Sequence, residues 1–186
     1  MKLTVSSRKE LKKSDTKRIR REGNIPAILY GLGHDNELVM VNGEEMRTHL
    51  RNMKSGLLAT TVFELTDGKK ARKAIVKDIH YHPVSYAILH MDFALVADDR
   101  AVTVNVPLQI TGTGDCVGIK LGGFLRQVIR SLKVECLPKH IPQEFTLDVR
   151  ELNLNEAKRL SDIAIPSNVR PMARMNEVAV VIAKKV

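Results

Sequence analysis

The sequence predicts a mainly β protein of the α+β class. We expect an N-terminal sheet or barrel of about six strands with two short helices, followed by a β-rich C-terminal domain. Short apolar or alternating runs recur along the chain, with Gly, Pro, Asp and Asn between them, and helical spacing is confined to short segments. A polar break, ADDR at 97–100, precedes a change of pattern. We therefore expect domains over 1–96 and 97–186.

The first predicted elements are a strand, a basic helix and a second strand. The run LTVSSR at 3–8 is typical of a short strand. Ser14 or Asp15 is placed to cap a short helix that continues through Arg21 and ends at Gly23. The apolar run IPAILYG at 25–31, bounded by Pro and Gly, predicts a buried strand.

A third strand and a second helix come next. ELVMV at 37–41 predicts the strand, and Asn42 is the expected N-cap of a helix over GEEMRTHLRNM. Within that helix Met46, Leu50 and Met53 recur at helical spacing. The spacing indicates that this stripe faces the core.

A hairpin and a last strand complete the first domain. Two alternating runs in TTVFELTDGKKARKAIV meet at Asp67-Gly68, which favours a type I′ turn because both central positions of that turn need positive φ. The segment SYAILHMDFALV at 85–96 supplies the further strand.

The second half reads as mainly β. AVTVNVPLQITG, from residue 101, predicts a long strand whose polar side carries Thr103, Asn105 and Gln109, and SLKVECLP, EFTLDV and EVAVVIAKKV predict more strands. LNEAKRLSDIAI predicts one short helix or turn before Pro166. The glycines of GTGDCVGIKLGG lack the spacing of a phosphate-binding loop and indicate turns and bulges.

Composition indicates a basic protein with an aliphatic core. Aromatic residues make up 4% and Trp is absent, and we expect Cys116 and Cys136 to be buried thiols. The net charge is +9, and residues 1–24 hold nine Lys or Arg against three acids, a local net of +6. Such a charge favours nucleic acid, although a membrane surface or simple solubility remains an alternative. There is no run of about 18 apolar residues and no leading apolar run, so we expect a cytoplasmic protein with no membrane partner.

The basic helix is the first candidate site. Successive helical residues are about 100° apart, so Lys17, Arg20 and Arg21 should lie near one another while Ile19 faces the core. This arrangement favours a phosphate clamp over an ordinary solvated basic face because acidic neighbours are few. Tyr30, beside that helix, is either a core residue or a contact that stacks on or hydrogen-bonds to RNA.

The densest polar cluster is HYHPVSYAILHMDF. His80, His82, His90 and Asp92 could converge from adjacent strands as zinc ligands, which gives a metal-dependent hydrolase as the alternative function. Otherwise His90 and Asp92 would read the shallow minor groove of an RNA helix, where base edges and 2′-hydroxyls are accessible. No nucleophile with a recognisable base partner, and no cofactor or small-molecule motif, is present in the sequence.

Several ordered motifs resemble the long form of the bacterial large-subunit ribosomal protein family L-twenty-five, also called general stress protein Ctc, over essentially the whole chain. The N-terminal motifs are Arg8-Lys9-Glu10, Lys17 to Gly23, Pro26 to Gly31, Asp78-Ile79 through His82-Pro83, and His90 to Phe93. The C-terminal motifs are Gly118-Ile119-Lys120, Gly122-Gly123, Val134 to Pro138, Ile141-Pro142 and Ser161-Asp162-Ile163.

The resemblance implies a six-stranded barrel that binds the loop E region of 5S rRNA in the central protuberance, without catalysis. It also implies a β-rich extension whose partners include neighbouring ribosomal proteins or other RNA. The chain departs from the family pattern at His80 and Tyr81, where Gln and Arg are usual, and at Lys12 to Asp15, which lacks the usual glycine. The resulting RNA-binding candidates are Arg8, Lys17, Arg18, Arg20, Arg21, Tyr30, His82, His90 and Asp92.

We therefore expect a ribosome-associated component of the large subunit that binds 5S rRNA and proteins of the central protuberance. We expect no enzymatic activity, metal, cofactor or small-molecule substrate. A third hypothesis is a stress-induced module whose partner is another protein.

Overall fold

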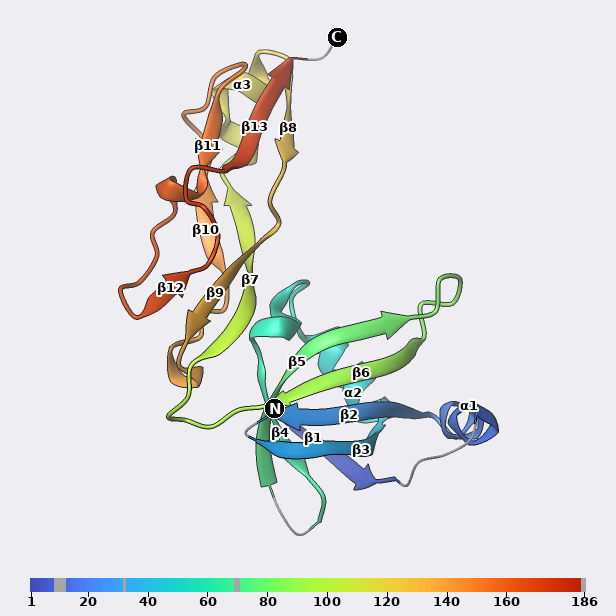
Figure 1. Cartoon of the computed structure of the whole chain (residues 1–186). Helices are drawn as coiled ribbons and strands as arrows, with labels where there is room; N and C mark the ends of the chain where they lie inside the picture. The colour runs from blue at the N-terminus through green and yellow to red at the C-terminus, as the bar shows by residue number, and fades with distance from the viewer. Residues whose placement is uncertain (9–12, 32, 69–70, 185–186) are drawn as a thin grey trace. The chain divides into compact units, whose positions relative to one another are not determined.

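The structure, a computed structural model, describes residues 1–8, 13–31, 33–68 and 71–184. The chain divides into two compact units, Met1–Arg100 and Ala101–Val186, which are described separately (Figure 1). None of the helices in the described ranges has the length and apolar character of a membrane-spanning helix.

In its described residues, unit 1 contains six strands, two α-helices and one 3-10 helix. Its elements are β1 (Lys2–Ser7), α1 (Lys13–Arg21), β2 (Asn24–Gly31), β3 (His34–Asn42), α2 (Gly43–Asn52), η1 (Leu57–Thr60), β4 (Val62–Thr66), β5 (Ala71–Tyr81) and β6 (Ile88–Leu95). This inventory confirms the expected six strands and two helices.

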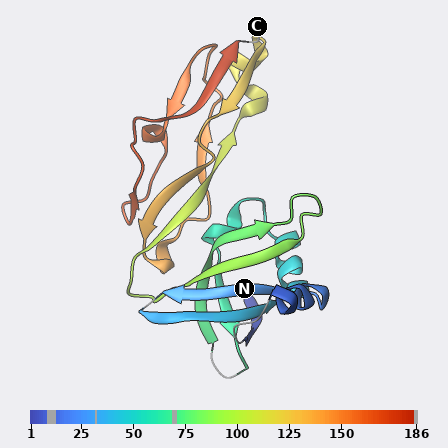
Figure 2. The same ribbon diagram turned by 45° about the vertical axis from the view of Figure 1, so that its right-hand side comes forward.

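The six strands form a closed barrel in the order β1-β3-β2-β6-β5-β4. Two of the pairings are parallel: β1 with β4, where Leu3 lies opposite Leu65, and β2 with β6, where Leu29 lies opposite Phe93. Figures 1 and 2 show the strands wrapping around a common interior, with α1 at one end of β2. Closure leaves no open sheet edge, so every strand has a neighbour on both sides.

The barrel interior is aliphatic with two phenylalanines. Phe63 and Phe93 are fully buried and meet edge to face, with ring centroids 6.4 Å apart. The helix α2 packs against this interior through Met46, which is also fully buried, while Leu50 and Met53 are partly buried against the same cluster. The prediction that this helical stripe faces the core is confirmed.

The two helix starts differ in how well the sequence predicted them. Asn42 is the N-cap of α2, since its side-chain oxygen accepts from the amides of Glu44 at 2.9 Å and Glu45 at 3.2 Å. The cap expected at Ser14 or Asp15 is wrong: α1 already begins at Lys13, so both residues lie in its first turn. There the negative charge of Asp15 favours the positive end of the helix dipole instead. The end of α1 is as expected, because Gly23 has a φ of +85°.

The hairpin between β4 and β5 forms, but the predicted two-residue turn at Asp67-Gly68 does not. Thr66 pairs with Ala71, so the connection is longer than two residues, and only Gly68 of that dipeptide has positive φ. The observed register places Ala74 opposite Phe63 inside the barrel. On the outer side it sets Lys73 opposite Glu64, and the ammonium group of Lys73 pairs with Asp98 at 2.9 Å.

Unit 2 consists of two small sheets with short helical turns. Its elements are β7 (Val102–Thr111), η2 (Thr113–Asp115), α3 (Val117–Lys120), β8 (Gly123–Gln127), β9 (Ser131–Cys136), η3 (Pro138–His140), β10 (Phe145–Asp148), β11 (Ala157–Arg159), η4 (Leu160–Asp162), β12 (Val169–Pro171) and β13 (Val178–Lys184). One sheet has the order β10-β7-β9-β12 and the other β11-β13-β8. The prediction of a β-rich second half is confirmed.

Several short elements of unit 2 escaped the sequence-based prediction. The short helix or turn expected before Pro166 is present as η4, but the strand β11 that precedes it was not predicted. The glycine-rich segment after β7 contains the single turn of α3 and leads into β8. Gly118 is needed there for close packing, because an added Cβ would lie 2.8 Å from the backbone of Asn153. Cys116 and Cys136 are buried free thiols, as expected, and burial raises the pKa of Cys136.

Candidate RNA interface

The outer surface of the barrel over β2, β6 and β5 brings the polar candidates together. Along β6, Met91 and Phe93 are fully buried, so the alternating residues His90 and Asp92 face outward. The strand register places His90 opposite His80 of β5 and Asp92 opposite Asp78. On the other side, the parallel partner of Asp92 is residue 28 of β2, two residues before Tyr30.

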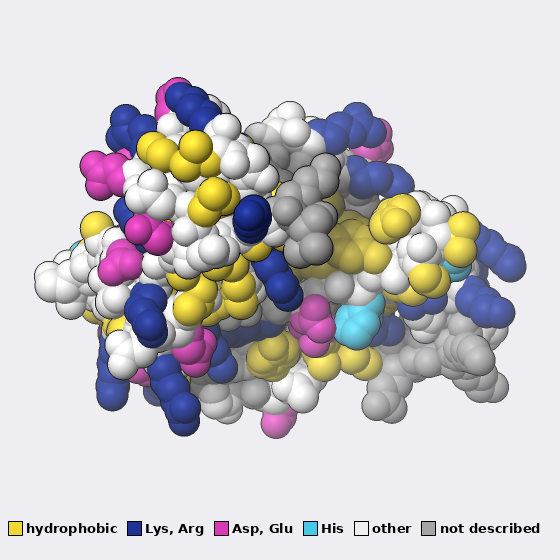
Figure 3. Space-filling view, turned by 90° about the horizontal axis from the view of Figure 1, so that it is seen from above, with side chains coloured by type: hydrophobic (Ala, Val, Ile, Leu, Met, Phe, Trp, Pro, Cys, Tyr) yellow, Lys and Arg dark blue, Asp and Glu magenta, His cyan; other side chains and the backbone are white. Residues whose placement is uncertain are grey.

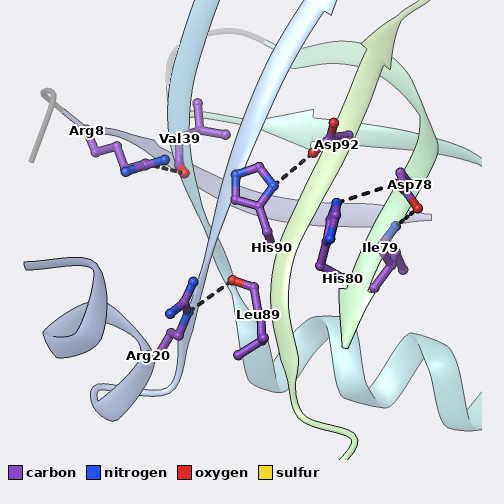
Figure 4. Close-up of polar contacts among 9 residues, drawn as sticks. All are labelled: Arg8, Arg20, Val39, Asp78, Ile79, His80, Leu89, His90 and Asp92. Carbon is purple, nitrogen blue, oxygen red and sulfur yellow. Dashed lines mark hydrogen bonds and ion pairs between the residues drawn. The ribbon is translucent and has the colours of Figure 1, made fainter. Parts of the chain in front are cut away.

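Two histidine–carboxylate pairs lie side by side on this surface (Figure 4). His90 Nδ1 is 2.8 Å from Asp92 Oδ1, and His80 Nε2 is 3.4 Å from Asp78 Oδ2. The two imidazole rings meet edge to face, with centroids 6.3 Å apart. An ionised carboxylate can only accept, so Nδ1 of His90 must carry the proton and its Nε2 is left as the other polar atom of the ring.

Tyr30 shares the electrostatic environment of these pairs. Its side chain is partly buried, and the pKa of its phenol is raised first by burial and then by the negative charges of Asp92 and Asp78. The phenol therefore stays neutral in the physiological range and keeps a hydroxyl that can donate. Together with the two histidine–carboxylate pairs, this hydroxyl gives the surface hydrogen-bond donors and acceptors close together.

Two arginines lie beside this surface and are held by backbone carbonyl groups. Arg8 Nε donates to the carbonyl of Val39 at 3.2 Å, and Arg20 Nε donates to the carbonyl of Leu89 at 3.0 Å (Figure 4). Burial lowers the pKa of Arg8, and the positive charge of Arg20 adds to the lowering. The two guanidinium groups thus repel one another, and an anion between them would relieve that repulsion.

The helix α1 presents the remaining predicted cations. Lys17, Arg18 and Arg21 are exposed, whereas Ile19 is buried with 3% exposure, which confirms the predicted inward residue. Arg18 lies 3.7 Å from both Asp15 and Glu22, weak exposed pairs that an anionic ligand can replace at little cost. Figure 3 shows Lys and Arg side chains gathered at the right-hand end of the view, where Figure 1 places α1.

His82 lies away from the other candidates, beyond the end of β5. Its Nδ1 accepts from the backbone amides of Val84 at 3.3 Å and Ser85 at 3.2 Å, so it organises the turn between β5 and β6. Sequence reasoning missed Asp78, although its spacing of two from His80 already placed both on one strand face. The flanking cations Lys9 and Lys12 lie outside the described residues, as do Glu10 and the side chain of Lys13.

The arrangement does not favour the metal-dependent hydrolase. Over the described ranges no group of three or more His, Cys, Asp or Glu side chains is placed to hold a metal ion. The four predicted ligands do not converge on one point. The ring of His82 accepts from a backbone amide of its own turn, whereas His80 and His90 each pair with a carboxylate of their own strand.

Comparisons with known proteins agree with the motifs. Residues 3–93 match a family model described as the Ribosomal L25p family, and residues 101–185 match one described as Ribosomal protein TL5, C-terminal domain. The protein named large ribosomal subunit protein bL25 from Chlamydia trachomatis serovar L2 is 45% identical over 185 residues, covering 100% of each chain. Proteins of the same name from Chlamydia abortus and Chlamydia pneumoniae are 43% and 40% identical over the same coverage. The chain therefore belongs to the bL25 family of ribosomal proteins, in the form that carries a TL5-type C-terminal domain.

Proposed function

We propose that this protein is a structural component of the large ribosomal subunit and that unit 1 binds 5S rRNA in the central protuberance, without catalysis. Its family membership supports association with the ribosome, because its full-length relatives are named as large-subunit proteins. The RNA partner and the residues that contact it are inferred from the chemistry of the barrel surface.

One observation carries the proposal: the polar surface with Tyr30, His90 and Asp92 is bordered by Arg8 and Arg20. In the described part of the chain, no acidic side chain pairs with either arginine, and each uses one N–H on a backbone carbonyl. Because a guanidinium has five N–H donors, the others remain for phosphate oxygens. A ligand that matches both the cations and the polar surface has a polyanionic backbone beside a groove of hydrogen-bonding groups, as an RNA helix does.

The proposed residues divide into two roles. The cations bind phosphates, position the protein on the RNA and make affinity salt-dependent; they are Arg8, Lys17, Arg18, Arg20 and Arg21. The polar surface between them contacts the minor groove through Tyr30, His90 and Asp92. Since a carboxylate is repelled by phosphate, Asp92 must meet an amino group or a hydroxyl. The groove contact expected at His82 stays a prediction.

The two domains, 1–96 and 97–186, would then have separate roles. The first binds 5S rRNA, and the second contacts neighbouring ribosomal proteins of the central protuberance.

Fluorescence anisotropy with the whole protein tests the proposal. Labelled 5S rRNA is titrated with protein, and an unlabelled duplex of matched length serves as the competitor. We expect 5S rRNA to be retained against an excess of the duplex and the affinity to fall as salt rises. Equal competition by the unrelated duplex would overturn the specific role and leave only general attraction to polyanions.

A further inference from the structure

A pocket lies beside the proposed RNA surface, at the end of the barrel where β5 and β6 are joined. Its volume is about 320 Å³, at the lower end of the range of small-ligand pockets, roughly 300 to 1,000 Å³. Its walls come from α1, α2, the start of β2 and the turn after β5. Arg20, which borders the proposed RNA surface, also lines this pocket.

The turn over 82–87 is held in one conformation by its own hydrogen bonds. The amide of His82 donates to the carbonyl of Ala87 at 2.8 Å, and the amide of Tyr86 donates to the carbonyl of His82 at 2.9 Å. Tyr86 adopts a φ of 54°, a left-handed conformation that is unfavourable for an aromatic residue. Strain of this kind, held by surrounding bonds, is found most often at binding sites.

The lining combines aromatic and apolar side chains with cations. Tyr81 and Tyr86 are 47% and 77% exposed, so both rings remain open to solvent, and Leu50 contributes an apolar wall. Arg47 of α2 joins Arg20 in the lining, and none of the described residues that form it is acidic. Uncompensated cations next to exposed rings require a ligand with an anionic group attached to a flat apolar surface.

We propose that this pocket binds an unpaired nucleotide of RNA. The base packs against Tyr81 and Tyr86, and its phosphate binds Arg20 and Arg47. Unstacked bases are the parts of RNA that aromatic side chains recognise. The inference rests on the proposed function for the identity of the ligand as RNA, but it assigns a site outside the strand surface with His90 and Asp92.

The test uses the whole protein and two RNA hairpins that differ by one bulged 2-aminopurine. We expect the bulged hairpin to bind roughly tenfold tighter, since stacking of one base contributes enough for such a change. The fluorescence of the 2-aminopurine should fall as it stacks. Tyr86→Gly and Arg47→Ala should each remove most of this preference. Tyr86→Gly should fold normally, because Gly adopts positive φ without strain.

Val84→Ala is the matched control. Val84 belongs to the same turn and is 81% exposed, but it does not line the pocket, so its replacement should leave the preference unchanged. Equal binding of both hairpins by the wild type would overturn the proposal. If the wild type and both variants prefer the bulged hairpin to the same extent, the proposal is overturned as well. Retained binding of 5S rRNA in those cases separates the failure of this pocket from failure of the proposed function.

Discussion

Arg20 in unit 1 and Arg150 in unit 2 show two opposite ways of holding a surface cation. Arg150 donates through Nε to Asp148 at 2.8 Å, so its charge is compensated within the unit. Arg20 donates to the carbonyl of Leu89 at 3.0 Å, which fixes the side chain but leaves its charge uncompensated. The difference teaches that the partner of a surface cation decides whether its charge remains available to a ligand. A cation held by a neutral partner is both ordered and available to phosphate.

The variant with the largest expected effect tests whether unit 1 alone binds RNA. Phe63 is fully buried and contacts Phe93, so Phe63→Ala should lower the free energy of unfolding by about 3 to 5 kcal/mol. Chemical denaturation followed by far-UV circular dichroism measures the loss, and 5S rRNA binding should fall in parallel. Leu147→Ala in the core of unit 2 is the control, and it should destabilise without changing RNA affinity. Loss of RNA binding in that control would contradict the assignment.

Asp92→Asn tests whether the polar surface beside Arg20 adds specificity to the attraction between cations and phosphate. The amide keeps the shape but loses the charge that fixes the His90 tautomer, so affinity for 5S rRNA should fall by about 1.5 to 3 kcal/mol. Competition anisotropy against an unrelated duplex should show lost discrimination. Asp115→Asn in unit 2 is the matched change and should have no effect. An equal loss of affinity for both RNAs would contradict a reading role for Asp92.

The two arginines can be compared directly by salt dependence. Arg20→Ala should reduce the slope of log affinity against log salt by roughly 0.7 to 0.9, as expected for one lost phosphate contact. Arg150→Ala should leave the slope unchanged because Arg150 already has Asp148 as its partner. Binding isotherms over a series of salt concentrations give both slopes. If the two variants behave alike, the partner of a cation does not decide whether it binds RNA.

The smallest expected effect concerns how much the Arg150–Asp148 pair stabilises the protein at low pH. Arg150 lowers the pKa of Asp148 from 3.8 to about 2, through its side-chain and backbone hydrogen bonds. A lowered pKa in the folded state means that the pair stabilises above about pH 3.8 and that this contribution disappears as the pH falls through 2. The thermal midpoint of Asp148→Asn should therefore approach that of the wild type as the pH is lowered. Because the pair is exposed, added salt should also reduce the difference.

The sequence predicted the barrel well because its strands are long and strongly patterned. His90 and Asp92 could be placed on one face from a spacing of two alone. Their juxtaposition with Tyr30 and Asp78 depends on the strand register, which pattern reasoning does not supply. The prediction for His82 treated it as part of the same strand, but β5 ends at Tyr81 and the chain turns there.

Short elements and loop geometry were the least predictable. In unit 2, β11 and β12 are each three residues long, too short to show a period. The pocket around Tyr86 depends on a left-handed residue that no propensity favours, held by hydrogen bonds within the turn. Such a site becomes visible only when the packing of α2 against the barrel is known.

The parallel pairings of β1 with β4 and of β2 with β6 have a consequence for ribosome assembly. Arg8 follows directly after β1, whose parallel partner β4 begins only at Val62. Tyr30 lies in β2, whose parallel partner β6 begins only at Ile88. The proposed RNA-binding surface therefore cannot form on a nascent chain until both partner strands have been synthesised, since distant segments must first meet. Binding of RNA through this surface would then follow synthesis of the whole barrel.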